Sequence, residues 1–432
     1  MTATIVVCAA TFLALTSSII FFPSIRIKRV KIGSYWVIAL VGAIVLFIFQ
    51  LAPVKIVYES LTADSAINPL KILALFFSMT FLSVYLDEAG LFAYLAQKAV
   101  KIVGSSQTAL FAVLYALAAV LTVFTSNDIV ILTLTPFICF FCKNTEVNPV
   151  PYLVGEFAAA NTWSMMLIIG NPTNIYLATS AGIDFMQYFS VMALPTLAAG
   201  AVEFSLILLI FGKRLKAPLK SRGDELPHIE KADVAVGLFH LAVCLVFLII
   251  SSYVGLEMWL ISVACAASLA ICVIILRLIK KDGWRRVGNS FKRLPRQLIP
   301  FVLSMFVIVV ALDYQGVNGL IAGLLGDKNC VWTYGLSSFF ASNLINNIPM
   351  SMLFSGLPTG LPQAEYFKAI YASIVGSNIG AFLTPIGALA GIMFTGLAER
   401  YKVNYTFRHF VGYGAIISLP TLAAALLVLS LV

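Results

Sequence analysis

The sequence has little charge for its length. Only 11% of its 432 residues are Asp, Glu, Lys or Arg, whereas 61% are hydrophobic, and the mean hydropathy is +0.99. Soluble globular chains carry about 25% charged residues. Too few charged side chains are present to cover a water-exposed surface of this size, which excludes a soluble enzyme. The net charge of +9 falls in short loops between apolar runs. This pattern is typical of contact with anionic membrane lipid, and we expect no nucleic-acid partner.

Signatures of catalysis and of metal binding are also missing. The chain has three histidines, no Gly-x-Ser-x-Gly sequence and no phosphate-binding loop, so a membrane enzyme lacks a visible nucleophile, base or metal cluster. The seven cysteines lie mostly inside apolar runs, where free thiols act as small hydrophobic side chains. Cys139 and Cys142 form a lone Cys-x-x-Cys pair, which predicts packing on one helix face. We expect no metal and no cofactor.

Long apolar runs, in contrast, are abundant. A membrane span needs about 20 residues, and ten segments fit that requirement. They are residues 5–22, 35–53, 69–86, 152–179, 191–211, 234–252, 259–278, 299–312, 367–397 and 411–432. Of the 28 Lys and Arg residues, 24 fall on one side of these spans. The positive-inside rule makes that side cytoplasmic. It predicts a multi-pass protein of the cell (inner or plasma) membrane with both termini outside.

Two further apolar stretches carry polar residues at their centres. They are residues 108–141, with Ser126-Asn127, and residues 331–354, with Ser342-Asn343. These dipeptides are 216 residues apart, half of the chain length. The long span after each stretch is interrupted as well. The interruptions are Gly170-Asn171-Pro172-Thr173-Asn174 within 152–179 and Thr384-Pro385-Ile386-Gly387 within 367–397.

The matching positions predict an inverted repeat. Each half has five spans, an odd number, so residues 217–432 would have the opposite orientation to residues 1–216. We therefore expect an all-α integral membrane protein with about ten transmembrane helices and two re-entrant helical hairpins. Interrupted apolar segments at corresponding positions of inverted halves favour a secondary transporter with its site at the membrane midplane.

Broken helices leave backbone N–H and C=O groups free at membrane depth, where only protein or a water-filled cavity satisfies them. The polar side chains at the tips and breaks are therefore candidates for substrate binding. They are Ser126, Asn127, Asn171, Thr173, Asn174, Ser342, Asn343, Asn346, Asn347, Asn378 and Thr384. The alternative is that each proline kinks a span and each asparagine bonds a neighbouring helix. Four interruptions in register favour the binding site.

Acidic residues inside spans need a reason, because an ionised carboxylate there costs roughly 2.5–3.5 kcal/mol. Asp128 at the first tip is the candidate for the coupling ion, H⁺ or Na⁺, together with Asn127 and Asn343. Its alternative role is to cap the helix that returns from the tip. Glu156 is expected in a cytoplasmic vestibule and Glu203 in a helix–helix contact. Asp87, Glu88 and Asp313 are expected at solvated turns.

Several motifs resemble the ion-transporter superfamily, and within it most closely the arsenite/antimonite efflux permeases. The segment Leu86-Asp87-Glu88-Ala89-Gly90-Leu91-Phe92 is similar to that family's Leu-Asp-Glu-Ser-Gly-Phe-Phe, and Ser126-Asn127-Asp128 resembles its Asn-Asp hairpin. Asn346-Asn347-Ile348-Pro349 and Thr384-Pro385-Ile386-Gly387 resemble its second-half motifs. The loop Gly170–Asn174 looks closer to the Gly-x-Pro-x-Asn loop of anion permeases and sodium/dicarboxylate carriers.

The resemblance implies an elevator-like carrier that exchanges arsenite or antimonite for protons, with an ATPase subunit as a partner in some members. The alternative is an importer of a small organic or inorganic anion, of the dicarboxylate or citrate class, coupled to sodium or protons. A channel is a third hypothesis, against which the paired hairpins argue. The expected partners are a small inorganic or organic solute, membrane lipid and a second copy of the chain in a homodimer.

Overall fold

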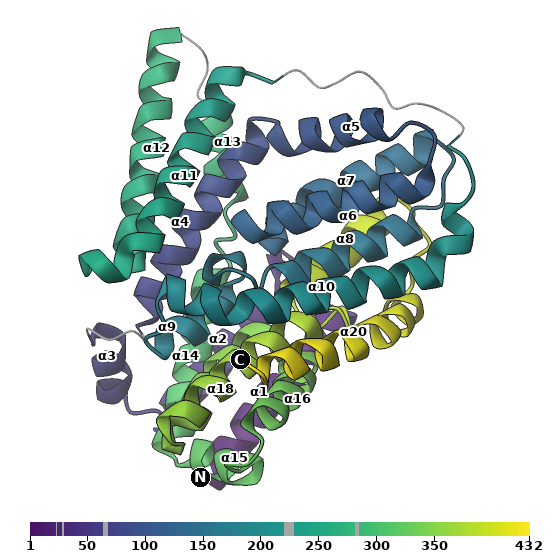
Figure 1. Cartoon of the computed structure of the whole chain (residues 1–432). Coiled ribbons are helices and arrows are strands. Elements are labelled where there is room, and N and C mark those ends of the chain that lie inside the picture. Colours follow the sequence, from purple (N-terminus) through teal and green to yellow (C-terminus); the bar gives the residue numbers. More distant parts are fainter. Residues whose placement is uncertain (23, 28–29, 64–67, 220–228, 281–284) are drawn as a thin grey trace.

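The computed structural model describes residues 1–22, 24–27, 30–63, 68–219, 229–280 and 285–432 (Figure 1). The elements of the first half are α1 (Thr2–Phe21), β1 (Ser24–Ile27), β2 (Val30–Gly33), α2 (Ser34–Ile48), α3 (Val54–Thr62), α4 (Pro69–Glu88), α5 (Leu91–Val103), α6 (Gln107–Phe124), α7 (Asn127–Asn144), α8 (Val150–Trp163), the 3₁₀ helix η1 (Ile168–Gly170), α9 (Pro172–Ser180) and α10 (Phe185–Leu215).

The elements of the second half are α11 (Lys231–Val254), α12 (Met258–Lys280), α13 (Arg285–Arg293), α14 (Leu298–Tyr314), α15 (Val317–Leu325), α16 (Cys330–Ile345), α17 (Asn347–Gly356), the 3₁₀ helix η2 (Leu357–Gly360), α18 (Gln363–Gly380), α19 (Leu389–Arg400) and α20 (Phe407–Leu429). The strands β1 and β2 form one antiparallel hairpin between α1 and α2, with Arg26 opposite Lys31.

The prediction of an all-α membrane protein is confirmed. Among the described residues, eight helical segments are long and apolar enough to cross a bilayer. Seven of them coincide with predicted spans, and the eighth is α6. The predicted span 35–53 is the shorter helix α2, with 15 residues. The predicted spans 152–179 and 367–397 are each divided into two helices.

The helices end where the polar residues stand. Helix α6 ends at Phe124 and α7 begins at Asn127, while α16 ends at Ile345 and α17 begins at Asn347. The following spans divide in the same way, as α8 and α9 in one half and α18 and α19 in the other. The orientation of residues 1–216 relative to 217–432 stays a prediction.

The helices pack as two groups. The first, here the α4 group, contains α1, α2, α4 and α11–α14, and Figure 1 shows α4, α11 and α12 side by side. The second, here the hairpin group, contains α6–α10 and α16–α20. The two groups meet where α4 contacts α7 and α9, where α14 contacts α17, where α1 contacts α16, and where α11 contacts α10. Each of the two packing groups therefore contains helices from both halves of the sequence.

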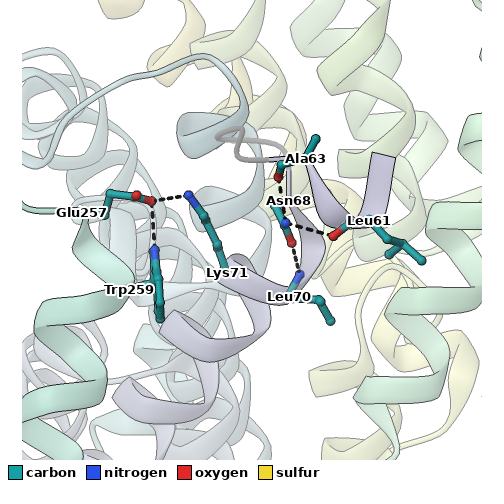
Figure 2. Close-up of polar contacts among 7 residues, drawn as sticks. All are labelled: Leu61, Ala63, Asn68, Leu70, Lys71, Glu257 and Trp259. Carbon is teal, nitrogen blue, oxygen red and sulfur yellow. Dashed lines mark hydrogen bonds and ion pairs between the residues drawn. The ribbon is translucent and has the colours of Figure 1, made fainter. Parts of the chain in front are cut away.

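Polar contacts fix the N-terminal end of α4 within its group (Figure 2). The Asn68 side chain caps the helix by accepting a hydrogen bond from Leu70 N at 2.9 Å, and Pro69 has the backbone angle that the first helical position needs. One turn further, Lys71 forms an ion pair of 2.7 Å with Glu257. Glu257 also accepts a hydrogen bond from Trp259 at 2.8 Å. The start of α4 is thus joined to the connection between α11 and α12.

The C-terminal end of α4 is joined to α13. Arg293 pairs with Asp87 at 2.5 Å and with Glu88 at 2.7 Å, and the Asp87 side chain is only 7% exposed. The expectation of a solvated turn for these two acids is therefore wrong. Arg293, 205 residues after Glu88, pairs with both carboxylates, and these ion pairs offset part of the cost of burying the two acids.

Two short helices connect the groups, and each lies between glycines with positive φ. Helix α5 follows Gly90 (φ 86°) and precedes Gly104 (φ 71°). Helix α15 follows Gly316 (φ 73°) and precedes Gly326 (φ 72°). Glycine adopts these left-handed angles without the steric cost that other residues carry. The chain can therefore turn sharply at both ends of each connecting helix.

Candidate functional site

The break after α8 is built around Asn171. Its side-chain Oδ1 accepts a hydrogen bond from Thr173 N at 3.2 Å, and Pro172 occupies the first position of α9. This Asn-Pro pair is a standard helix start, because the amide satisfies a free N–H and proline needs no donor there. The other end of the Asn171 amide remains available, and it donates to Asn378 at 2.9 Å.

Asn378 of α18 forms hydrogen bonds with three side chains of this break. Its Oδ1 accepts from Asn171 and also from Ser164 Oγ at 2.8 Å, and its Nδ2 donates to Asn174 Oδ1 at 2.6 Å. All four residues are buried, with exposures of 0–2%. We call Ser164, Asn171, Asn174 and Asn378 the amide cluster. It joins residues of the first half to a residue of the second half that lies more than 200 positions later in the chain.

The tip of the first hairpin lies against α8. Asn127 donates from Nδ2 to Asn161 Oδ1 at 3.2 Å, and Asn161 in turn donates to Phe157 O at 2.8 Å. Ser126 is buried, and its hydroxyl has no hydrogen-bond partner among the described residues. Asn161 lies only one turn before Ser164 of the amide cluster. The first tip and the first break are therefore neighbours.

The tip of the second hairpin lies against the break between α18 and α19. Asn343 Oδ1 accepts from both the backbone N–H and the hydroxyl of Thr384, at 3.1 and 2.7 Å. Its Nδ2 donates to Gly380 O at 2.9 Å. Both polar ends of one amide thus satisfy the backbone of the broken helix.

Asn346 and Asn347 complete this contact. Asn346 Nδ2 donates to Ile386 O at 2.9 Å, and its Oδ1 caps α17 by accepting from Ile348 N at 3.3 Å. The backbone N–H of Asn347 donates to Gly387 O at 2.9 Å. Asn346 has φ 73° and ψ 153°, a region used almost only by glycine. The local structure holds this strained backbone at the tip.

Not every candidate has a free polar group at the site. The Ser342 hydroxyl donates to Phe339 O in its own helix, and the residue packs against Gly380. The Thr173 hydroxyl is buried without a partner among the described residues, and so is the hydroxyl of Ser377, which was not among the candidates. Sequence reasoning also left Asn161 and Ser164 out of the site. The 217-residue spacing of Asn161 from Asn378 was the available signal for the first, whereas nothing in the pattern indicated Ser164.

Small residues hold the second hairpin against α18. A Cβ at Gly376 would lie 2.0 Å from Ser338 Oγ and 2.3 Å from Gly335 O, and one at Gly380 would lie 2.4 Å from Ser342 Oγ. The pattern is Gly-x-x-x-Gly on α18 facing Ser-x-x-x-Ser on α16, which permits close approach of helix backbones. This close packing sets the position of Asn343 relative to the break.

Three acids that the sequence analysis singled out, Asp128, Glu156 and Glu203, lie in different surroundings within the hairpin group. Asp128 is half-buried, and no described residue forms a hydrogen bond or ion pair with its carboxylate; it does not cap α7, whose cap residue is Ser126. Glu203 is fully buried and accepts from Tyr115 Oη at 2.9 Å and from the Thr162 hydroxyl, which is the expected helix–helix contact. Glu156 is 2% exposed and accepts from Thr135 Oγ1 at 2.9 Å, so it does not face an open vestibule.

In the described part of the chain, the site has no cationic partner for an anion. Among the described residues, no Lys or Arg forms a hydrogen bond or ion pair with a residue of the two tips or two breaks. A cavity of about 400 Å³ reaches the second break, where Pro385 and Ile386 line it together with α19, the α19–α20 connection and Ile19 at the end of α1. The cavity therefore extends from the second break to the C-terminal end of α19.

Comparison with known proteins identifies the family. The citrate transporter family pattern matches residues 31–376, which is most of the chain. The chain is 26% identical over 378 residues to the arsenical pump membrane protein of Escherichia coli K12, covering 83% of this chain and 85% of the relative. It is 24% identical over 389 residues to an uncharacterized transporter of Synechocystis (83% and 84%) and 25% identical over 367 residues to a putative arsenical pump membrane protein of Bacillus subtilis 168 (76% and 80%). These relatives are membrane transporters, and the resemblance of the sequence motifs is confirmed. The chain belongs to the citrate transporter family.

Proposed function

We propose that the chain is a secondary active transporter that works by elevator-type alternating access. One observation carries this proposal: every candidate binding residue lies in the hairpin group, and none lies in the α4 group. A site that belongs to one packing unit can move with that unit as a whole. The α4 group, with α4 joined at both ends to its neighbours, supplies the stationary part.

The proposal includes two re-entrant hairpins in inverted halves. Its test is cysteine labelling with a membrane-impermeant reagent at exposed hairpin ends: Ser105 and Lys143 for the first, Lys328 and Thr359 for the second. Both positions of the first hairpin should label from the cytoplasm, and both positions of the second from outside. The native cysteines are buried except Cys272, which is half-buried, so replacing Cys272 gives a quiet background. Labelling of the two ends of one hairpin from opposite sides contradicts re-entry.

The chemistry of the site favours a neutral, hydroxyl-rich substrate. Amide and hydroxyl groups surround the tips and breaks, and they bind O–H groups as donors and acceptors without a formal charge. Arsenous acid and its antimony counterpart have this character, in agreement with the arsenical pump relatives. We propose export of such a solute in exchange for protons. Asp128, a half-buried acid at the first tip with no cation beside it, is the proposed proton carrier.

A small carboxylate is the second candidate, and two observations favour it. The matching family is described as a citrate transporter family. In addition, α7 and α17 both begin at hairpin tips, where helix N-termini present N–H groups that attract anions. In this case Na⁺ would supply the positive charge, with Asp128, Asn127 and Asn343 as proposed ligands.

The deciding experiment is flux into proteoliposomes of purified protein. Arsenite, antimonite, citrate and succinate are each measured with a sodium gradient, with a pH gradient and with neither. Transport of arsenite or antimonite driven by the pH gradient supports the first proposal, and sodium-driven citrate or succinate transport supports the second. Solute flux that is the same with a sodium gradient, with a pH gradient and with neither contradicts a coupled carrier and supports a channel.

The remaining assignments are proposals of the same kind. We propose a plasma-membrane location with both termini outside, a homodimer, and an ATPase subunit as an energising partner. Copurification from native membranes tests the ATPase, and the mass of the detergent-solubilised particle tests the dimer. A monomeric particle without an ATPase contradicts both.

A further inference from the structure

A basic cavity lies in the hairpin group, away from the tips and breaks. Its volume is about 560 Å³, and it is lined by residues from the α7–α8 connection, the end of α10, the α19–α20 connection and the start of α20. Lys143, Arg214, Lys402 and His409 are among the lining residues, together with Tyr401 and Tyr413. The cavity therefore lies at the Lys- and Arg-rich ends of these helices. The sequence predicts that this side is cytoplasmic.

None of the acids that the structure describes pairs with the cations at this cavity. Lys143, Arg214 and Lys402 are exposed, and none of them forms an ion pair with a described residue. Among the described residues, those that line the cavity include no Asp or Glu. Helix α8 also begins at the cavity, with Asn148 Oδ1 accepting from Val150 N at 3.0 Å, so its N-terminal dipole adds to the positive potential. Three cations and a helix N-terminus around one hollow favour an anion with several oxygens.

Exposed apolar side chains continue from the rim of the cavity along two helices. Phe140 is 55% exposed and lies one turn from Lys143 on α7, and Ile416 is 57% exposed and lies one turn from Tyr413 on α20. Residues three apart on a helix share a face. The basic hollow and an apolar surface are therefore adjacent, which is the arrangement that a lipid headgroup and its acyl chains require.

We propose that this cavity binds a phosphate group, and that its source is an anionic phospholipid of the cytoplasmic leaflet. Lys and Arg bind phosphate oxygens strongly, and the cytoplasmic leaflet carries the negative lipid that basic residues near the surface attract. The cavity connects α7 and α8 to α10 and α20, so a bound lipid would join the two halves of the hairpin group at one membrane surface. This assignment is independent of the transported substrate.

The test is lipid retention by the purified full-length protein. Native mass spectrometry counts bound phosphatidylglycerol and phosphatidylcholine after exchange into detergent. The variant is Lys143→Gln with Arg214→Gln and Lys402→Gln. Its matched control, Lys101→Gln with Lys213→Gln and Arg408→Gln, removes three exposed charges that do not line the cavity. At roughly fivefold in affinity for each cation, the first triple variant should bind phosphatidylglycerol about 100-fold more weakly, and the control should be unchanged.

Additional arms separate the two phosphate sources. Inorganic phosphate and glycerol phosphate are added at increasing concentration during a melting experiment. Stabilisation of the wild-type protein by either, lost in the cavity variant, would show a soluble phosphate as the source and overturn the lipid assignment. The charge-conserving variant Lys143→Arg with Lys402→Arg should retain phosphatidylglycerol, which shows that loss in the Gln variant reflects charge and not folding. Equal retention by the two Gln variants overturns the site.

Discussion

The side-chain amide of Asn378 donates a hydrogen bond of 2.6 Å to Asn174, which lies 204 residues earlier in the chain. Both side chains are fully buried, and Asn378 also accepts from Asn171 and Ser164. The break of the first half is therefore held by a helix of the second half. A substitution of Asn378 should therefore disturb both the break of the first half and helix α18 of the second half.

Asn378→Ala should reduce transport at least tenfold while the protein remains folded. It removes the acceptor of Asn171 and the donor to Asn174, and a lost partner of a buried polar group costs about 1–3 kcal/mol. The control is Ser373→Ala on the same helix, because the Ser373 hydroxyl bonds only to Ala369 O one turn away. The measurement is flux into proteoliposomes at equal protein content. Equal loss in both variants would remove the special role of Asn378.

Asn346→Ala should melt at a lower temperature than Asn346→Gly. Both variants lose the bonds to Ile386 O and Ile348 N, but alanine also adopts the φ of 73° only with strain of about 1–3 kcal/mol. Glycine tolerates this angle. Thermal unfolding of the purified protein gives the order. A glycine variant that melts with or below the alanine variant contradicts a strained tip.

Gly376→Ala should destabilise the contact between α16 and α18. The added Cβ would meet Ser338 Oγ at 2.0 Å and Gly335 O at 2.3 Å, and overpacking of this kind costs about 1–3 kcal/mol. Gly396→Ala is the control, since nothing lies within 4 Å of its Cβ and alanine is the better helix former. Melting temperatures should fall for the first and stay equal or rise for the second.

Asp128→Asn should uncouple transport from the pH gradient. The variant keeps the size of the side chain but cannot release a proton, so solute should still exchange down its own gradient and should no longer accumulate against it. Asp313→Asn, in the last turn of α14, serves as the control for removing an acid. A pH-driven gradient of normal size in Asp128→Asn would assign coupling to another group.

Glu203→Leu should destabilise the hairpin group, and Glu203→Gln should not. Leucine leaves the Thr162 hydroxyl without its acceptor in a fully buried place and removes one acceptor of Tyr115, at a cost of about 1–3 kcal/mol. Glutamine retains an acceptor for Tyr115. The two melting curves test the difference. If the Gln variant unfolds as early as the Leu variant, the second carboxylate oxygen or the negative charge of Glu203 is needed for the contact.

The sequence predicted the places where helices stop, because those places depend on local chemistry. Asn171-Pro172 favours a helix start, because Asn is a good N-cap and Pro suits the first helical position, and Ser126-Asn127 interrupts an apolar run by composition alone. The partner of each polar group was beyond reach, since it depends on packing across the fold. Nothing near Asp87 in the sequence indicates that Arg293 will neutralise it. Likewise, the role of Ser342 as a packing residue follows from Gly380 on another helix.

In the proposed elevator mechanism, the connecting helices α5 and α15 would limit the movement of the hairpin group. A helix behaves as a stiff rod of about 1.5 Å per residue, so the 13 residues of α5 reach about 20 Å and the 9 residues of α15 about 13 Å. The glycines at both ends of each helix permit rotation of the chain, whereas the helix between them does not lengthen. Because the two connecting helices differ in length, the proposed movement of the hairpin group would not be a pure translation. The group would tilt instead, and the side attached to α15 would move the shorter distance.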